Sequence, residues 1–227
     1  MTGAAGSPRM RRAPRGYHCR AVIDALVIFK PDGAHRLAAR ATLWSWLKSE
    51  RDWKLAGLTW HRPTTALIER HYDFLRDRPF FPWLVDFMTA LPVLVGCVRA
   101  ESDGLERMRY ELGETRISES RPGSLRERLG IGGGVNVLHL SDSAESAARE
   151  IELWGHHVSL DATVDLAETT DRPDHTYRLR SLANQYAAGI HADRAGQAIR
   201  RLLREESDLL GDDFESLVRV VLRAFRS

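Results

Sequence analysis

Four short apolar runs recur along the chain, separated by charged or turn-forming residues. Each is dense in valine, isoleucine and leucine, which is typical of a strand buried in a sheet. The first ends at Lys30–Gly33, where proline and glycine predict a turn. The predicted strands are Ala21–Phe29, Leu55–Arg62, Pro92–Val98 and Val135–Leu140.

Between these runs, apolar residues recur every three or four positions, which predicts helices. Leu37, Ala41, Trp44 and Leu47 share one face of the first helix, and the last helix follows a Ser-Asp-Ser cap. A long irregular segment, Gly113–Gly134, separates the later elements, and loops of that length are usually functional or disordered. The other predicted helices are Thr64–Leu75, Phe80–Ala90, Ser102–Leu112 and Ala144–Trp154.

Strands and helices therefore alternate as β-α-β-α-β-α-β-α, an order that favours an α/β or α+β sandwich. The compact candidate is an α+β fold in which helices flank a ferredoxin-like βαββαβ antiparallel sheet. The two ends differ in composition from this part. Residues 1–21 contain five arginines and no acidic residue, so we expect a disordered basic tail. Residues 156–227 are expected to form an Asp-rich linker and a C-terminal extension of two or three amphipathic helices.

Composition excludes several classes of protein. The 227 residues are 43% apolar, and 33 Lys+Arg nearly balance 31 Asp+Glu. This balance argues against a protein that binds nucleic acid through overall positive charge. Two cysteines cannot build a disulfide framework, which fits a reduced, cytoplasmic protein. No apolar run approaches the roughly 20 residues that span a bilayer, so we expect no membrane partner.

One histidine has a distinctive position. His139 lies at the end of the fourth predicted strand, just before a helix start, where free N–H groups and the helix dipole favour anions. A nucleophilic histidine needs one free ring nitrogen and an acceptor on the other. Glu150, on the following helix, is placed to be that acceptor. Taken alone, a structural histidine and an exposed glutamate are the commoner cases.

Basic side chains occur near the same junctions. Lys30 follows the first strand, at the end where open α/β sheets place ligands. Arginine binds phosphate oxygens in bidentate fashion, although each residue taken singly is as typical of a solvated surface. The arginines in or near the long irregular segment are Arg109, Arg116, Arg121 and Arg126.

Six segments occur in a fixed order along the chain. They are LVIFKPDG (Leu26–Gly33), HYDFLRDRPFFPWLVDFM (His71–Met88), PV (Pro92-Val93), LGET (Leu112–Thr115), RPGSLR (Arg121–Arg126) and NVLHLSDSAESAAREIELW (Asn136–Trp154). In this order and spacing, residues 22–155 resemble the nucleoside diphosphate kinase family.

The resemblance implies a ping-pong reaction in which ATP phosphorylates a histidine, and the phosphohistidine then phosphorylates a nucleoside diphosphate. It implies that His139 is the nucleophile, that Glu150 orients its imidazole, and that Tyr72 lies beside it. It also implies Mg²⁺ held mainly by the nucleotide phosphates, no metal site on the protein, and a homo-oligomer. The residues that match nucleotide-binding positions are Lys30, Arg109, Thr115 and Arg126 for the sugar hydroxyl and phosphates, Asn136 for the ribose, and Phe80 and Leu84 for the base.

The chain departs from the family pattern at several positions. Leu140 replaces the glycine that follows the histidine, and Gly133 replaces a small apolar residue that faces the base. Arg116-Ile117 replaces Asn-Pro in a loop that helps subunits associate. These departures leave a second hypothesis, a weakly active or inactive nucleotide-binding scaffold whose C-terminal helices bind a partner.

Overall fold

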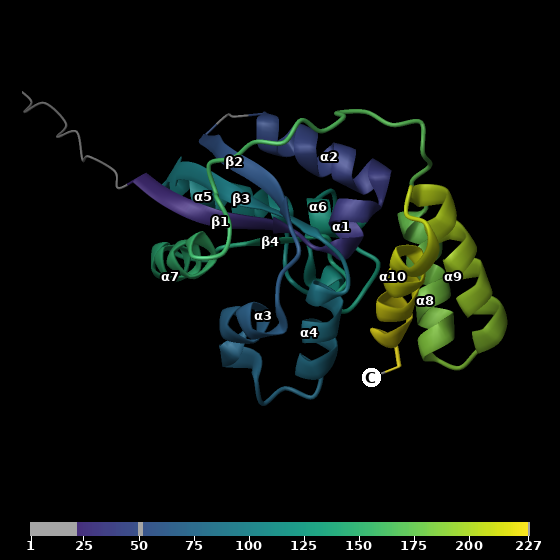
Figure 1. The fold of residues 1–227 in the computed structure, drawn as a ribbon. Coiled ribbons are helices and arrows are strands. Elements are labelled where there is room, and N and C mark those ends of the chain that lie inside the picture. Colours follow the sequence, from purple (N-terminus) through teal and green to yellow (C-terminus); the bar gives the residue numbers. More distant parts are fainter. Residues whose placement is uncertain (1–21, 50–51, 227) are drawn as a thin grey trace, which may run out of the picture.

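A four-stranded antiparallel sheet in the order β2-β3-β1-β4 forms the centre of the molecule (Figure 1). The computed structural model describes residues 22–49 and 52–226, so the predicted basic tail lies outside the described residues. The sheet and its flanking helices confirm the predicted ferredoxin-like α+β fold. The strands are β1 (Val22–Phe29), β2 (Trp53–His61), β3 (Val93–Glu101) and β4 (Leu138–Leu140).

Alternating side chains of the strands supply two apolar clusters, one on each face of the sheet. Leu26 and Ile28 of β1 belong to one cluster, and Val27 and Phe29 belong to the other. The first cluster includes residues of α3 (Thr65–His71), α4 (Phe81–Thr89) and α7 (Ala144–Gly155). The second includes residues of α1 (Pro31–His35), α2 (Leu37–Lys48), α5 (Ser102–Leu112) and α6 (Leu125–Leu129).

Three amphipathic helices follow at the C-terminal end and pack beside the sheet region (Figure 1). They share the first apolar cluster, to which Ile199 and Val221 contribute. The indole N–H of Trp83 on α4 also donates to the carbonyl of Val220, at 2.9 Å. The helices are α8 (Thr176–Ala187), α9 (Ala192–Glu206) and α10 (Gly211–Arg223).

A buried ion pair joins these helices to the start of α2. The guanidinium of Arg36 is bonded to the carboxylate of Glu206, and it also donates to Thr176 Oγ1 at 2.6 Å and to the carbonyl of Leu129 at 2.7 Å. Arg36 and Glu206 are each 1% exposed. A buried guanidinium is tolerated only when such partners replace water.

The outer edge of β2 is covered by the segment that leads to the C-terminal helices. Leu58 donates its N–H to the carbonyl of Ala162 at 2.7 Å and accepts from Val164 at 2.8 Å. Unpaired strand edges promote association between copies. The chain therefore protects this edge itself.

Three sequence predictions need correction. Lys30–Gly33 is not a simple turn, because Pro31 occupies the first position of α1, where its fixed φ suits a helix. The helix predicted over Thr64–Leu75 ends at His71, and a separate 3₁₀ turn covers Asp73–Leu75.

The third correction concerns the strand predicted over Val135–Leu140, which is shortened to Leu138–Leu140 because Val137 has a φ of 67°. In addition, the irregular segment contains α6 and a 3₁₀ turn, Ile117–Glu119. Among the described helices, none is long and apolar enough to cross a bilayer.

Candidate active site

A strained residue shapes the backbone that enters the site. The φ of Val137 lies in the left-handed region, which β-branched residues rarely adopt. Its N–H donates to Asp32 Oδ2 at 3.0 Å, and its carbonyl accepts from the N–H of Lys30 at 2.9 Å. Gly33 is required here, because a Cβ at this position would lie 2.1 Å from the Val137 carbonyl oxygen. Strain held in this way is often found at functional sites.

His139 lies on β4 and is bonded to Glu150 on α7. His139 Nε2 and Glu150 Oε2 are 2.9 Å apart, and the Ser141 hydroxyl donates to the same oxygen at 2.7 Å. Burial acts to raise the pKa of Glu150, but its hydrogen bond with His139 and the charge of that ring outweigh burial and lower it. Glu150 is therefore an ionised acceptor that holds Nε2–H, which leaves Nδ1 as the nitrogen with a free lone pair.

Two buried aromatic side chains surround the His139 ring. The ring centroid of His71 is 4.6 Å away, and that of Tyr72 is 6.1 Å away. Because the indole N–H of Trp154 can only donate, His71 Nδ1 is the acceptor in their 3.2 Å bond. Burial and the neighbouring His139 lower the pKa of His71 well below its usual value, so this ring is neutral with its proton on Nε2.

Sequence reasoning gives His71 no role. The one sequence signal that could have pointed to His71 is its position next to Tyr72, at the start of the family-like segment His71–Met88. The Tyr72 hydroxyl is buried without a hydrogen-bond partner among the described residues, and burial raises its pKa.

Three cationic side chains are bonded to β4 or to the residues that lead into it. Lys30 Nζ donates to Asn136 Oδ1 at 2.7 Å, and Arg126 donates to the carbonyl of Leu138 at 2.8 Å. Arg109 donates to the carbonyl of Leu140 at 3.1 Å. None of the three forms an ion pair with a carboxylate of the described residues.

The protein environment disfavours the charges of Lys30 and Arg126. Burial, followed by the charge of Arg126, lowers the pKa of Lys30 to about 7. Burial and Arg109 lower the pKa of Arg126 to about 10. The nearby Asp32 carboxylate acts to raise both pKa values but does not offset burial. Cations that lack an ion pair among the described residues are suited to an anion with several charged oxygens.

The remaining predicted residues are Asn136, Thr115, Phe80 and Leu84. Asn136 Nδ2 donates to the carbonyl of Thr115 at 2.8 Å, so the Thr115 loop is joined to the site through its backbone. Phe80 is 40% exposed just before α4, and Leu84 on α4 is buried. No hydrogen bond or ring contact among the described residues joins these two to His139.

A family model described as "Nucleoside diphosphate kinase" matches residues 24–159, more than half of the chain. The chain belongs to the nucleoside diphosphate kinase family. This confirms the resemblance inferred from the six segments, and the matched region ends before α8.

Individual members of the family agree with this assignment. The nucleoside diphosphate kinase of Synechococcus sp. (strain CC9605) is 40% identical over 129 residues, which cover 56% of this chain and 83% of the relative. Human nucleoside diphosphate kinase A is 37% identical over 130 residues, which cover 57% of this chain and 84% of the human protein.

Solved structures of the family show the same fold. The enzyme of Aquifex aeolicus has a TM-score of 0.51 at 34% identity, covering 59% of this chain and 94% of that one. The Halobacterium salinarum enzyme in complex with CDP has a TM-score of 0.53 at 28% identity. The match covers 69% of this chain and 97% of that one.

The largest departure from the family pattern next to the histidine does not crowd the site. Leu140 is 2% exposed and packs in the second apolar cluster, with Val27 and Ala147. Neighbouring residues of a strand point to opposite faces, so the Leu140 side chain faces away from the side where His139 meets His71. Its carbonyl accepts from Arg109.

One group of side chains among the described residues is close enough to share a metal ion. The ligand atoms of His71, His139 and Glu150 lie within 4.8 Å of one another. Two imidazoles and one carboxylate do not match Mg²⁺, which prefers oxygen ligands in octahedral geometry. The group is therefore unsuited to be a magnesium site.

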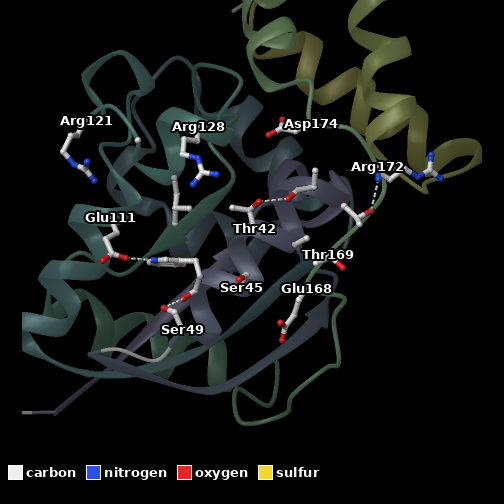
Figure 2. A pocket seen from close by; sticks show the side chains of 16 residues that line it. Thr42, Ser45, Ser49, Glu111, Arg121, Arg128, Glu168, Thr169, Arg172 and Asp174 are labelled. Carbon is white, nitrogen blue, oxygen red and sulfur yellow. Dashed lines mark hydrogen bonds between the residues drawn. The ribbon is translucent and has the colours of Figure 1, made fainter.

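A pocket of about 730 Å³ lies elsewhere on the molecule, between α2 and the segment that leads to α8 (Figure 2). Arg121 and Arg128 approach it from one side, and Glu168 and Asp174 lie near the linking segment. Of the candidate arginines only Arg121 lines this pocket, and none of the residues matched to the family's site does. Its mixed charges indicate no particular ligand.

Proposed function

We propose that the protein transfers the γ-phosphoryl group of ATP to nucleoside diphosphates through a phosphohistidine at His139, and so maintains nucleoside triphosphate pools. Membership of the nucleoside diphosphate kinase family supports phosphoryl transfer between nucleotides. The observation that carries the histidine assignment is the Glu150 bond at Nε2, which leaves Nδ1 free on a strand whose flanking carbonyls, those of Leu138 and Leu140, accept from Arg126 and Arg109.

In the first half-reaction, His139 Nδ1 attacks the γ-phosphorus of ATP. An N–P bond forms, the bond from the γ-phosphorus to the bridging oxygen breaks, and ADP leaves with that electron pair. Glu150 stabilises the positive charge that develops on the ring through its bond to Nε2–H. In the second half-reaction, a β-phosphate oxygen of a nucleoside diphosphate attacks the phosphohistidine and breaks the N–P bond.

The cations neutralise the phosphate oxygens as charge moves during transfer. Arg109, Arg126 and Thr115 bind the β- and γ-phosphates, and Lys30 contacts the sugar hydroxyl and the transferred group. Phosphoryl transfer needs mainly positioning and charge neutralisation. Tyr72 lies beside the nucleophile and helps to fix its position.

The rest of the nucleotide extends away from His139. Asn136 binds the ribose, Phe80 stacks on the base, and Leu84 lines the base pocket. Stacking uses no hydrogen bonds to the base edge, so the site accepts several nucleotides. Mg²⁺ would be held mainly by the nucleotide phosphates, where it would neutralise part of their charge, since the nitrogen-rich group of His71, His139 and Glu150 does not suit it.

We place the protein in the cytoplasm and propose that residues 22–155 form the kinase domain, with residues 156–227 as linker and helical extension. A homo-oligomer stays a prediction. Residues 162–164 pair with the edge of β2 only at Leu58.

The scaffold hypothesis has less support. It rested on departures such as Leu140, whose side chain packs in the core rather than against the proposed phosphate site. The family match and the polar network around His139 favour the enzyme.

The decisive experiment labels the protein with γ-labelled ATP and then adds GDP. Wild type is expected to form an acid-labile phosphoprotein and to make labelled GTP. His139→Ala is expected to lose transfer by at least about 10³-fold, because the nucleophile is missing. His156→Ala removes an exposed histidine just after α7. It is the matched control and should keep both signals. A wild type that neither becomes labelled nor makes GTP would refute the proposal.

A further inference from the structure

The last turn of the chain packs on a run of glycines that leads into the proposed site. Gly132 and Val135 form a tight backbone bridge, and Asn136 and His139 follow shortly after. A Cβ added at Gly132 would lie 2.9 Å from Cε1 of Phe225, and one at Gly133 would lie 3.8 Å from the Ala224 carbonyl oxygen. Phe225 therefore lies directly against the glycine run.

The same end of α10 is fastened to the helix that carries the proposed base-binding residues. The bond from Trp83 to the Val220 carbonyl joins α4 to α10, and Arg223 forms an ion pair with Asp86. These two α4 residues lie on either side of Leu84 in sequence. Figure 1 shows the C-terminal end beside α4.

The glycines leave room for Phe225 and Trp83, and they have no apolar side chains of their own. A Cβ at Gly134 would lie 2.5 Å from the Trp83 ring, so side chains at Gly132 and Gly134 would displace Phe225 and Trp83. Gly133 has a φ of 55°, which disfavours other residues. This turn therefore has no side chain of its own to contact a planar ligand.

We propose that Phe225, backed by Ala224, supplies a second apolar wall of the base-binding site, whose first wall is Phe80. The ring is half-buried and packs against the first apolar cluster beside Gly132. The inference rests on the proposed function, since it takes the nucleotide to lie along Lys30, Asn136 and Phe80. It makes a residue of the C-terminal extension a determinant of nucleotide binding.

The test measures ADP binding by calorimetry in a His139→Ala background, where no transfer occurs. Phe225→Ala should weaken ADP binding about fivefold, the scale of one aromatic contact, and Phe225→Leu should weaken it less. Binding of inorganic tripolyphosphate, which has no base, should be the same with and without Phe225→Ala. Arg226→Ala removes an exposed neighbour whose guanidinium lies over the Tyr186 ring, and should leave ADP binding unchanged.

A second variant guards against misfolding. A chain ending at Arg223 keeps the Val220 carbonyl and the Asp86 ion pair, and it should weaken ADP binding as Phe225→Ala does. Unchanged or tighter ADP binding in both variants would overturn the inference, as would equal weakening of tripolyphosphate. The proposed function is scored separately by wild-type phosphohistidine formation, so either can fail without the other.

Discussion

Two buried arginines show how the same side chain serves different ends in two regions of the molecule. Arg36, at the junction with the C-terminal helices, is bonded to the Glu206 carboxylate, and although burial acts to lower its pKa, Glu206 raises it. Arg126, near His139, is bonded to two backbone carbonyls, and burial and Arg109 lower its pKa. The Nε–H of Arg126 has no partner among the described residues.

The difference separates structural charge from charge held for a ligand. A buried charge whose partners lie within the chain contributes to the fold, whereas one without a counter-ion marks a binding site. Other unsatisfied groups near His139 fit this interpretation. They are Asp32 Oδ1, His71 Nε2 and Tyr72 Oη.

The largest expected effect tests the structural arginine. Glu206→Ala leaves the buried Arg36 guanidinium with only the longer, 3.6 Å ion pair to the exposed Asp174, and should lower the free energy of unfolding by about 3–5 kcal/mol. Urea denaturation of both proteins measures this difference. Glu215→Ala is the control, since its ion pair with Arg200 is exposed and should contribute little to stability. Equal costs for the two variants would remove the distinction drawn for Arg36.

A smaller effect, on activity instead of stability, tests the second arginine. Arg126→Ala should reduce kcat/KM for GDP by about 100-fold, because a charge-assisted contact to the phosphates is lost. Its stability should fall by less than that of Glu206→Ala. Arg128→Ala, two residues away and exposed on the same helix, is the control with near-normal kinetics. If Arg126→Ala keeps phosphoryl transfer but loses much of its free energy of unfolding, then Arg126 stabilises the fold, as Arg36 does, and does not bind phosphate.

The smallest expected effect is the uptake of a proton by Lys30 when ADP binds. With a pKa of about 7, Lys30 is mostly neutral at pH 8 and becomes charged when phosphates bind. ADP binding at pH 8 should therefore take up about 0.9 proton more in wild type than in Lys30→Met. Calorimetry in buffers of different ionisation enthalpy measures the uptake, and Lys54→Met, on an exposed position of β2, is the control.

The same group affects stability with a definite sign. Between pH 7 and 10.5 the unfolded chain holds the lysine proton and the folded chain does not, so wild type gains stability as pH rises. Lys30→Met should lack this gain. Identical proton uptake and identical pH profiles in the two proteins would contradict a depressed pKa at Lys30.

Local signals explain which parts of the fold the sequence predicted well. The helix Ser102–Leu112 was predicted to the residue, because its apolar spacing is regular and Gly113 follows it. The strand predicted over Val135–Leu140 was too long, because Val137, whose N–H is bonded to Asp32 105 residues away, has a left-handed conformation and only Leu138–Leu140 forms the strand. No local pattern carries that information.

In the candidate site, too, contacts between consecutive elements were predictable and long-range contacts were not. The contact between His139 and Glu150 was predictable, since the strand and helix that carry them are consecutive. The roles of the individual site residues stay predictions. Contacts of Arg36 with Glu206, or of Phe225 with Gly132, were beyond sequence reasoning because no motif links such distant positions.

During synthesis, Arg36 leaves the ribosome 170 residues before Glu206. At usual rates of translation this delay is about 10–30 s. Throughout that interval the nascent sheet carries a guanidinium that it cannot bury without its counter-ion. The final compact state is therefore reached only when α9 emerges, and a pause in translation between these two positions would prolong the exposure of apolar surface to chaperones and proteases.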